Sequence, residues 1–139
     1  MEHEQLKDFS YLNSIANLRT LRAGYFFRDI VTTGYAALDG VVEAAIMGGA
    51  ASRFTDLVKI SGTNTSTAAI AVDIRSGTGS GIMDTILIPS ANTLTKLYEV
   101  PLASSEQNVP WTAQAKGTEA TGAPITISMV GVKTSKRAF

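Results

Sequence analysis

Few residues in this 139-residue chain are able to do chemistry, and most of them are carboxylates. Cysteine is absent, and the single histidine, His3, lies beside the N-terminus. The lack of cysteine excludes disulfides, thiolate metal sites and cysteine nucleophiles. A histidine at the chain terminus does not supply the positioned base of a Ser-His-Asp triad or the ligand shell of a metal. We therefore predict no catalytic residue, no metal site and no cofactor.

Paired carboxylates are the catalytic arrangement that remains, since a glycoside hydrolase needs two acids on either side of its bond. Asp73 and Asp84 flank a glycine-rich turn. Glu43 or Glu99 would complete an acidic face. Asp73 alternates with apolar neighbours and stands close to Arg75, which is typical of an outward side chain in an exposed cross-strand ion pair. We expect solvated carboxylates or an exposed cross-strand ion pair, and a hydrolase that uses Asp73 and Asp84 is the weaker hypothesis.

Residues 77–81, Gly-Thr-Gly-Ser-Gly, have the composition of a phosphate-binding loop. Their spacing matches neither G-x-G-x-x-G nor G-x-x-x-x-G-K-[ST]. The residues that follow, 82–86, favour a strand, whereas a phosphate loop leads into a helix. The cluster therefore predicts a mobile hairpin or loop between two strands.

Trp111 follows Pro110 at the start of an expected strand. An exposed aromatic ring is the platform of many carbohydrate-binding sites, whereas a lone Trp more often anchors a core or a sheet edge. A possible ligand site at Trp111 and the loop 76–81 therefore stays open beside the core interpretation. The sequon at Asn64 is expected to be a polar turn.

The charges of the chain balance, with twelve Lys and Arg against twelve Asp and Glu. A neutral chain has no global electrostatic attraction to nucleic acid or to an anionic membrane. The first residues lack the basic and apolar regions of a secretory signal, and no apolar run reaches the ~18 residues of a membrane span. We expect neither nucleic acid nor membrane as a partner.

From residue 41 onward the apolar residues alternate with a period of two, which is typical of half-buried strands. Ile70, Val72 and Ile74 share one face of a strand, and residues 56–57 interrupt the alternation of another. Turn clusters rich in Gly, Asn, Ser or Pro separate these runs. The pattern predicts an all-β antiparallel sandwich or jelly roll of about seven to eight strands. Seven strands are expected at residues 41–47, 53–60, 68–75, 82–88, 94–100, 110–116 and 124–132.

Residues 1–40 differ from the rest, and we expect an N-terminal arm there and a β-sandwich domain over 41–139. Large apolar residues recur every three positions, and on a helix such steps smear around most of the circumference. Short helical or extended segments gripped by a neighbouring chain explain this spacing better than one amphipathic helix. Residues 23–34 read as extended or strand-like. The expected partner-contact residues are Leu6, Phe9, Leu12, Ile15, Leu18, Leu21, Tyr25, Phe26 and Phe27.

The order of strand and turn types resembles a sandwich module of tailed-bacteriophage virion proteins, notably capsid decoration and head-fibre proteins. The resemblance covers about two-thirds of the chain and leaves out the first forty residues. It implies a structural virion component, made in the host cytoplasm, that acts by assembly and has no catalytic residues. The resembling stretches are residues 51–60, 71–78, 88–94, 98–102, 111–115 and 125–132.

Three functions follow as expectations. The first is a capsid decoration or minor capsid protein that oligomerises and docks on other virion proteins such as the major capsid protein. The second is a carbohydrate- or receptor-binding module of a phage tail or fibre, with its site at Trp111. The third is the carboxylate hydrolase.

Overall fold

The computed structural model describes residues 25–104 and 106–136, and for residues 25–30 and 135–136 it describes the backbone only. Eight strands and one short 3₁₀ helix, η1 (Thr118–Ala120), make up the described chain. The strands are β1 (Tyr25–Leu38), β2 (Ala44–Met47), β3 (Arg53–Asn64), β4 (Ile70–Ser76), β5 (Ile82–Ile88), β6 (Asn92–Leu102), β7 (Trp111–Ala115) and β8 (Ile125–Lys136).

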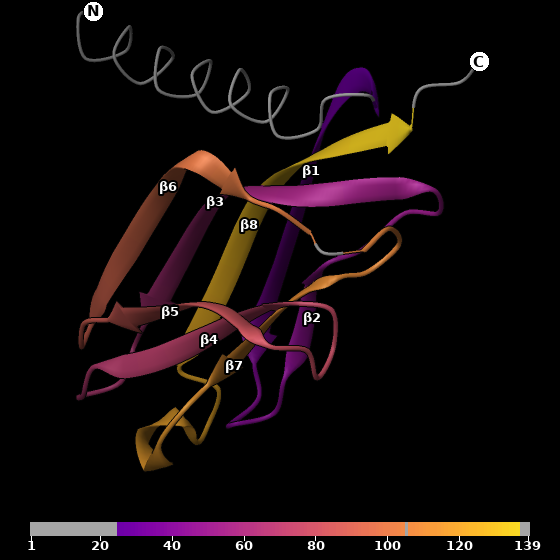
Figure 1. The fold of residues 1–139 in the computed structure, drawn as a ribbon. Coiled ribbons are helices and arrows are strands. Elements are labelled where there is room, and N and C mark those ends of the chain that lie inside the picture. The colour runs from indigo at the N-terminus through magenta and orange to yellow at the C-terminus, as the bar shows by residue number, and fades with distance from the viewer. Residues whose placement is uncertain (1–24, 105, 137–139) are drawn as a thin grey trace, which may run out of the picture.

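The strands form two antiparallel four-stranded sheets packed face to face (Figure 1). One sheet has the order β1-β8-β3-β6 and the other the order β2-β7-β4-β5. Pairing joins the first strand to the last, the second to the seventh, the third to the sixth and the fourth to the fifth. The chain is thus one long hairpin, with its tip at β4 and β5, that is rolled into two layers. This is a jelly roll, and the expected all-β sandwich is confirmed.

All seven strands expected from the alternation are present, with ends shifted by a few residues. The eighth is β1, which pairs with β8 from Tyr25 to Leu38. The strand-like interpretation is therefore correct for residues 25–34, which belong to the sheet, and residues 23–24 lie outside the described part of the chain. The sandwich thus begins within the segment that was expected to be an arm, because β1 completes the hydrogen bonding of β8.

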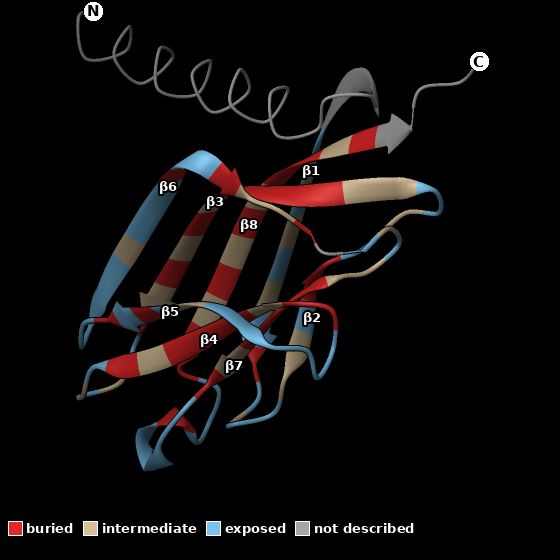
Figure 2. Cartoon of the chain, in the orientation of Figure 1, coloured by how far each residue is buried: buried red, intermediate tan, exposed pale blue. Residues whose placement is uncertain are grey.

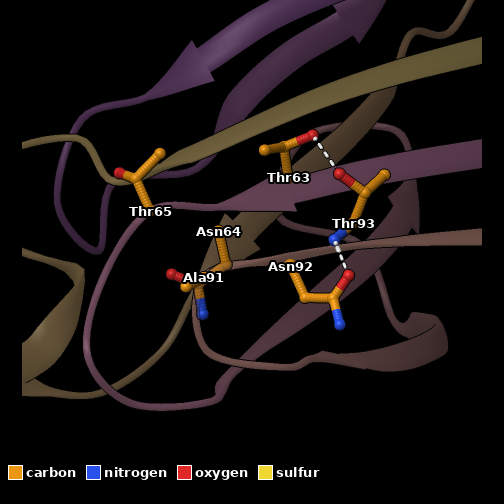
Figure 3. A pocket seen from close by; sticks show the side chains of 6 residues that line it. All are labelled: Thr63, Asn64, Thr65, Ala91, Asn92 and Thr93. Atoms are coloured by element: carbon orange, nitrogen blue, oxygen red, sulfur yellow. Dashed lines mark hydrogen bonds between the residues drawn. The ribbon is translucent and has the colours of Figure 1, made fainter.

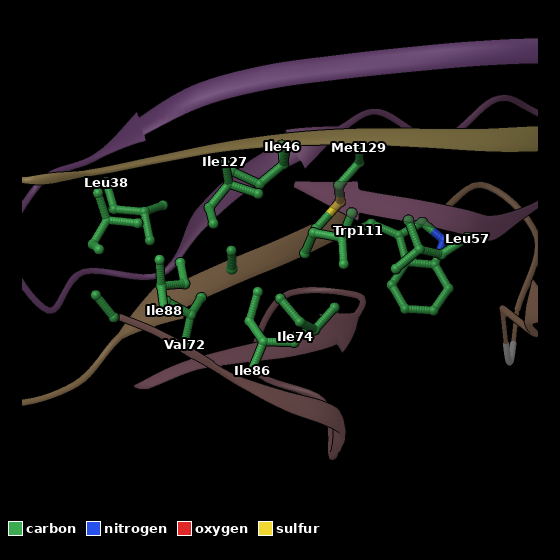
Figure 4. Packing of buried hydrophobic residues seen from close by; sticks show 14 of the residues in the cluster. Leu38, Ile46, Leu57, Val72, Ile74, Ile86, Ile88, Trp111, Ile127 and Met129 are labelled. Carbon is green, nitrogen blue, oxygen red and sulfur yellow. The ribbon is translucent and has the colours of Figure 1, made fainter. Parts of the chain in front are cut away.

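The alternating apolar residues fill the space between the sheets. Ile70, Val72 and Ile74 are all at most 1% exposed, and so are Ile125, Ile127 and Met129 on β8. Figure 4 shows Val72, Ile74, Ile127 and Met129 in one layer with Trp111, Leu57 and the isoleucines of β5. The interruption at residues 56–57 is a β-bulge, since the register of β3 shifts between Leu57 and Lys59 against both of its neighbours. Figure 2 shows the same layer of buried residues in red.

Three inward positions of the first sheet are glycines, and the second sheet fills the space that they leave. A Cβ on Gly34 would collide with the backbone of Ile46 and lie 2.7 Å from Met47 Cα. A Cβ on Gly131 would lie 2.6 Å from Met47 Cε. At Gly62 the obstacle is the end of the Ile88 side chain. The flank formed by β1 and β2 therefore closes by direct approach of two backbones.

Replacing Gly34 with alanine is expected to lower the free energy of unfolding by about 2–3 kcal/mol, because the backbone of Ile46 has little room to move away. Gly62→Ala should lower the free energy of unfolding by about 1 kcal/mol less than Gly34→Ala does, since the end of the Ile88 side chain is able to change rotamer. Urea denaturation of both variants measures the difference.

Gly48→Ala is the matched control, because no atom lies within 4 Å of its Cβ position. Its free energy of unfolding should stay within about 0.5 kcal/mol of the wild-type value. Equal losses in all three variants would show that close packing at Gly34 is not what closes this flank.

Candidate functional site

Asp73 lies on the outer face of the β2-β7-β4-β5 sheet, yet only 1% of it is exposed. Lys116 Nζ lies 2.8 Å from its Oδ2, and the Thr85 hydroxyl donates a hydrogen bond of 2.8 Å to its Oδ1. Arg75 stands 3.9 Å from the same carboxylate and donates to Gln114 Oε1 at 2.7 Å. Asp73 faces outward and is ion-paired, as one of the two expectations had it. Its expected exposure was wrong, because side chains from three strands and the chain after β7 cover it.

Asp84 takes the opposite direction and points between the sheets. It stands opposite Ile74 in the register, whereas Asp73 stands opposite Thr85. The hydroxyl of Tyr98 donates to Asp84 Oδ2 at 2.6 Å, and Lys96 Nζ donates to the same oxygen at 2.9 Å. Both partners lie on β6 of the other sheet, so Asp84 closes the flank of the sandwich that is formed by β5 and β6.

The two carboxylates therefore do not form a catalytic pair. Since successive residues of a strand point to opposite faces, Asp73 and Asp84 have the sheet between them. Glu43 lies near the β4–β5 loop and Glu99 is exposed on β6, so neither joins them in one acidic cleft. The hydrolase hypothesis was wrong in its geometry.

The environment of both aspartates favours the charged form. Burial raises the pKa of Asp73, but the hydrogen bonds from Lys116 and Thr85 outweigh it and hold that pKa below its ordinary value. Burial likewise opposes ionisation of Asp84, and the bonds from Tyr98 and Lys96 again lower its pKa. The pKa of Tyr98 is raised by its own burial and by the neighbouring carboxylate. Each acid is a charged structural group at neutral pH.

The glycine-rich loop between β4 and β5 binds a carboxylate of the protein itself. The Gly79 amide donates to both oxygens of Glu43, at 3.1 and 3.2 Å. The Thr112 hydroxyl donates to the same carboxylate. Glycine is needed at positions 77 and 79, where φ is +95° and +72°. The loop is the turn of the β4–β5 hairpin, as expected, and the anion it holds is Glu43.

Trp111 is fully buried. Its indole N–H donates to the backbone oxygen of Thr55 on the other sheet. The ring is therefore packed in the core, and its one polar group has a hydrogen-bond partner there. The possible ligand role of Trp111 is therefore wrong, since a sugar has no access to the ring. Nothing in a single sequence distinguishes an inward from an outward Trp at the first residue of a strand.

A shallow depression of about 400 Å³ lies where β3 ends and β6 begins. It has no charged residue, and Figure 3 shows the pair Thr63 and Thr93 hydrogen-bonded across it, with their hydroxyl oxygens 3.1 Å apart. Asn64 is buried beneath it and donates to the backbone oxygens of Ala68 and Ile88, at 2.8 and 3.1 Å. The sequon is thus a polar turn, as expected. The lining residues are Thr63, Asn64, Thr65, Ala91, Asn92 and Thr93.

Of the expected partner-contact residues, Leu6, Phe9, Leu12, Ile15, Leu18 and Leu21 lie outside the described part of the chain, and so do the side chains of Tyr25, Phe26 and Phe27. Within the described ranges, no three acidic or histidine side chains gather closely enough to hold a metal ion. The described residues also include no helix that is long and apolar enough to span a membrane.

Comparison with solved structures relates this fold to virus capsids. No protein-family model matches the chain, and no curated protein matches it in sequence. A chain of the acidic stable capsid structure of Helicobacter pylori bacteriophage KHP30 superposes with a TM-score of 0.53 and 7% identity, over 82% of this chain and 93% of that one. A chain of the cyanophage Pam1 capsid asymmetric unit gives a TM-score of 0.50 and 12% identity, over 78% and 85%.

The fold is the β-sandwich of viral capsid proteins. Identities this low relate folds and not activities. The coverage means that the jelly roll accounts for most of each phage capsid chain as well as most of this one.

The Asp73 cluster should make stability depend on pH. Because the pKa of Asp73 is lower in the folded than in the unfolded chain, the unfolded chain binds more protons between the two values. The stabilisation is complete above about pH 5, where the unfolded chain is also ionised, and is lost as pH falls through the unfolded and then the folded pKa. Asp73→Asn should lower the free energy of unfolding by about 1–2 kcal/mol at pH 7. The variant should also lose less of that free energy than the wild type does between pH 5 and pH 2.

Urea denaturation at pH 7, 5 and 3 measures this effect, with the exposed Asp39→Asn as the control. Because Asp84 titrates in the same direction, the variant should keep part of the pH dependence. An unchanged pH profile in Asp73→Asn would contradict the assigned role of the cluster.

Glu43 should hold the glycine loop in place. Glu43→Ala removes the acceptor of the Gly79 amide, so hydrogen exchange of that amide should accelerate about tenfold or more while the core amides of β4 keep their protection. Glu119→Ala, which removes an exposed carboxylate of η1, is the control. Exchange at Gly79 that is equally slow in both variants would show that the loop does not depend on Glu43.

Proposed function

We propose that this protein is a structural component of a phage virion, as a capsid decoration or minor capsid protein. It oligomerises and docks on neighbouring virion proteins such as the major capsid protein. The observation that carries the proposal is the eight-strand jelly roll, which spans nearly the whole of a KHP30 capsid chain and most of a Pam1 capsid chain. In this proposal its location is the virion, after synthesis in the host cytoplasm.

The use of the polar residues supports a role without catalysis. Asp73, Asp84 and Glu43 are all engaged in holding strands or loops together. A protein of this kind works through contact area and surface shape, and such contacts need no excess of charge. The balanced charge of the chain agrees with this mode of action.

The N-terminal segment is proposed as an element of assembly. Its large apolar residues recur every three positions, so one surface of a small sandwich cannot bury all of them. A neighbouring subunit that surrounds the segment buries them on several sides. Because β1 is the edge strand of its sheet, the described chain begins at an edge of that sheet.

The rival function is a carbohydrate- or receptor-binding module of a phage tail or fibre. Its two expected features are both engaged by the protein itself, since Trp111 is buried in the core and the exposed loop binds Glu43. Among the described residues, the uncharged depression at Thr63 and Thr93 offers a surface to a neutral glycan. A glycan array that gives a signal abolished by Thr93→Lys would favour this rival.

The full chain should self-associate at micromolar concentration, and a charge among the apolar residues of the N-terminal segment should weaken the assembly. Leu12→Asp is expected to lower the association constant about tenfold or more, because the charge would have to be buried at the contact. Sedimentation velocity over a range of concentrations measures this.

Asn13→Asp is the matched control, since it adds the same charge at the neighbouring polar position. It should assemble like the wild type. A wild type that stays a 14.7 kDa monomer throughout would contradict the proposed function. Equal assembly of wild type and Leu12→Asp would contradict the role of the N-terminal segment alone.

A further inference from the structure

The outer face of the β2-β7-β4-β5 sheet has a polar centre between two apolar margins. Across the sheet, Thr85 of β5 stands beside Asp73 of β4, and Asp73 stands beside Gln114 of β7. We propose that a second copy of this chain packs on this face, so that two such faces meet about a two-fold axis. The inference rests on the proposed function, because it names the surface through which the protein would assemble.

The charges in the centre already neutralise one another within one copy. Asp73 is paired with Lys116 and Arg75, and Glu43 accepts hydrogen bonds from Gly79 and Thr112. Two acids and two bases leave this centre with no net charge, so an identical face meets no excess of like charge. A protein partner that carried a large charge of either sign would gain nothing here.

Part of this centre has lost its water before any partner arrives. Asp73 is 1% exposed and the side chain of Arg75 only 15%, whereas the side chain of Lys116 is 56% exposed. Covering an ion pair costs free energy because both ions lose their hydration. Folding has already met that cost for Asp73 and Arg75, so the further loss of hydration on covering the centre falls on the Lys116 ammonium group.

The margins supply the apolar area. On β5, Ile82 stands opposite Arg75 and Leu87 stands opposite Ala71, and these two side chains are 49% and 60% exposed. At the far margin, Gln114 donates to the backbone oxygen of Val41, and Val41 is 52% exposed. Figure 2 shows the exposed stretch of β5 beside the buried β4.

This order of apolar, polar and apolar stripes makes the face self-complementary. A two-fold axis parallel to the strands places the β5 margin of one copy over the Val41 margin of the other. An axis across the strands places β5 over β5. Either arrangement sets apolar side chains against apolar side chains and leaves the neutral centre against itself, as an isologous contact requires.

The outer face of the other sheet carries two kinds of residue. Between β3 and β6 it has hydroxyl pairs, with Ser61 and Thr95 at 3.1 Å and Thr63 and Thr93 at 3.1 Å. On β1 it has Val31 and Tyr35, which are 50% and 73% exposed. Leu97, which is 36% exposed, stands opposite Lys59 on the same face of that sheet. Leu97 therefore provides a control, since Leu87 and Leu97 are exposed leucines on the edge strands β5 and β6 of opposite sheets.

The test compares Leu87→Glu with Leu97→Glu in the full chain by sedimentation velocity and light scattering. Leu87→Glu should lower the association constant about tenfold or more, and Leu97→Glu should assemble like the wild type. Thermal melts establish that both variants are folded, as expected for substitutions at exposed positions.

A second measurement does not depend on disrupting the contact. The chain has no cysteine, so Leu87→Cys and Leu97→Cys each introduce a single thiol. Maleimide labelling of Cys at 87 should slow as the protein concentration rises, while labelling at 97 should not.

The outcomes separate this inference from the proposed function. A wild type that is monomeric at every concentration overturns both. An oligomer that withstands Leu87→Glu, or that only Leu97→Glu disrupts, overturns this inference and leaves self-assembly standing.

Discussion

The separation of the two sheets is the constraint on which the rest of this molecule depends. Gly34 lets the backbone of β1 approach that of β2 so closely that a methyl group would not fit. The approach brings Met47 against Gly131, and the same packed layer holds Trp111 where its indole reaches Thr55. The opposite flank closes differently, because Asp84 joins Tyr98 and Lys96 across the gap between β5 and β6. One flank is thus fixed by backbone contact and the other by a charged hydrogen-bonded group.

The carboxylates of this chain serve the fold. Asp73 joins β4, β5 and the chain after β7, and Glu43 joins the start of β2 to the β4–β5 loop. In an enzyme, such acids would face a cleft with their oxygens available to a substrate. In this protein the carboxylate oxygens of Asp73 and Glu43 bind donors of the protein itself. Asp73 and Glu43 therefore join segments of the described chain that are distant in sequence.

The surfaces of the two sheets are distinct, although both are faces of one jelly roll. Between β3 and β6 the β1-β8-β3-β6 sheet presents threonine and serine hydroxyls that bond to one another, and on β1 it presents the exposed Val31 and Tyr35. The β2-β7-β4-β5 sheet presents a neutralised ionic centre with apolar margins.

The sequence by itself determined the strands, because alternation and turn residues are local properties. Ile70, Val72 and Ile74 are inward where the period of two places them, and residues 77–81 form a turn because glycine tolerates their dihedral angles. Only the tertiary structure decided which polar and aromatic side chains are buried. Asp73 is covered by Lys116 from beyond β7, and Glu43 meets Gly79 across 36 positions of sequence. The burial of a side chain depends on strands that are brought together by the rolling of the whole hairpin, and no local pattern carries that information.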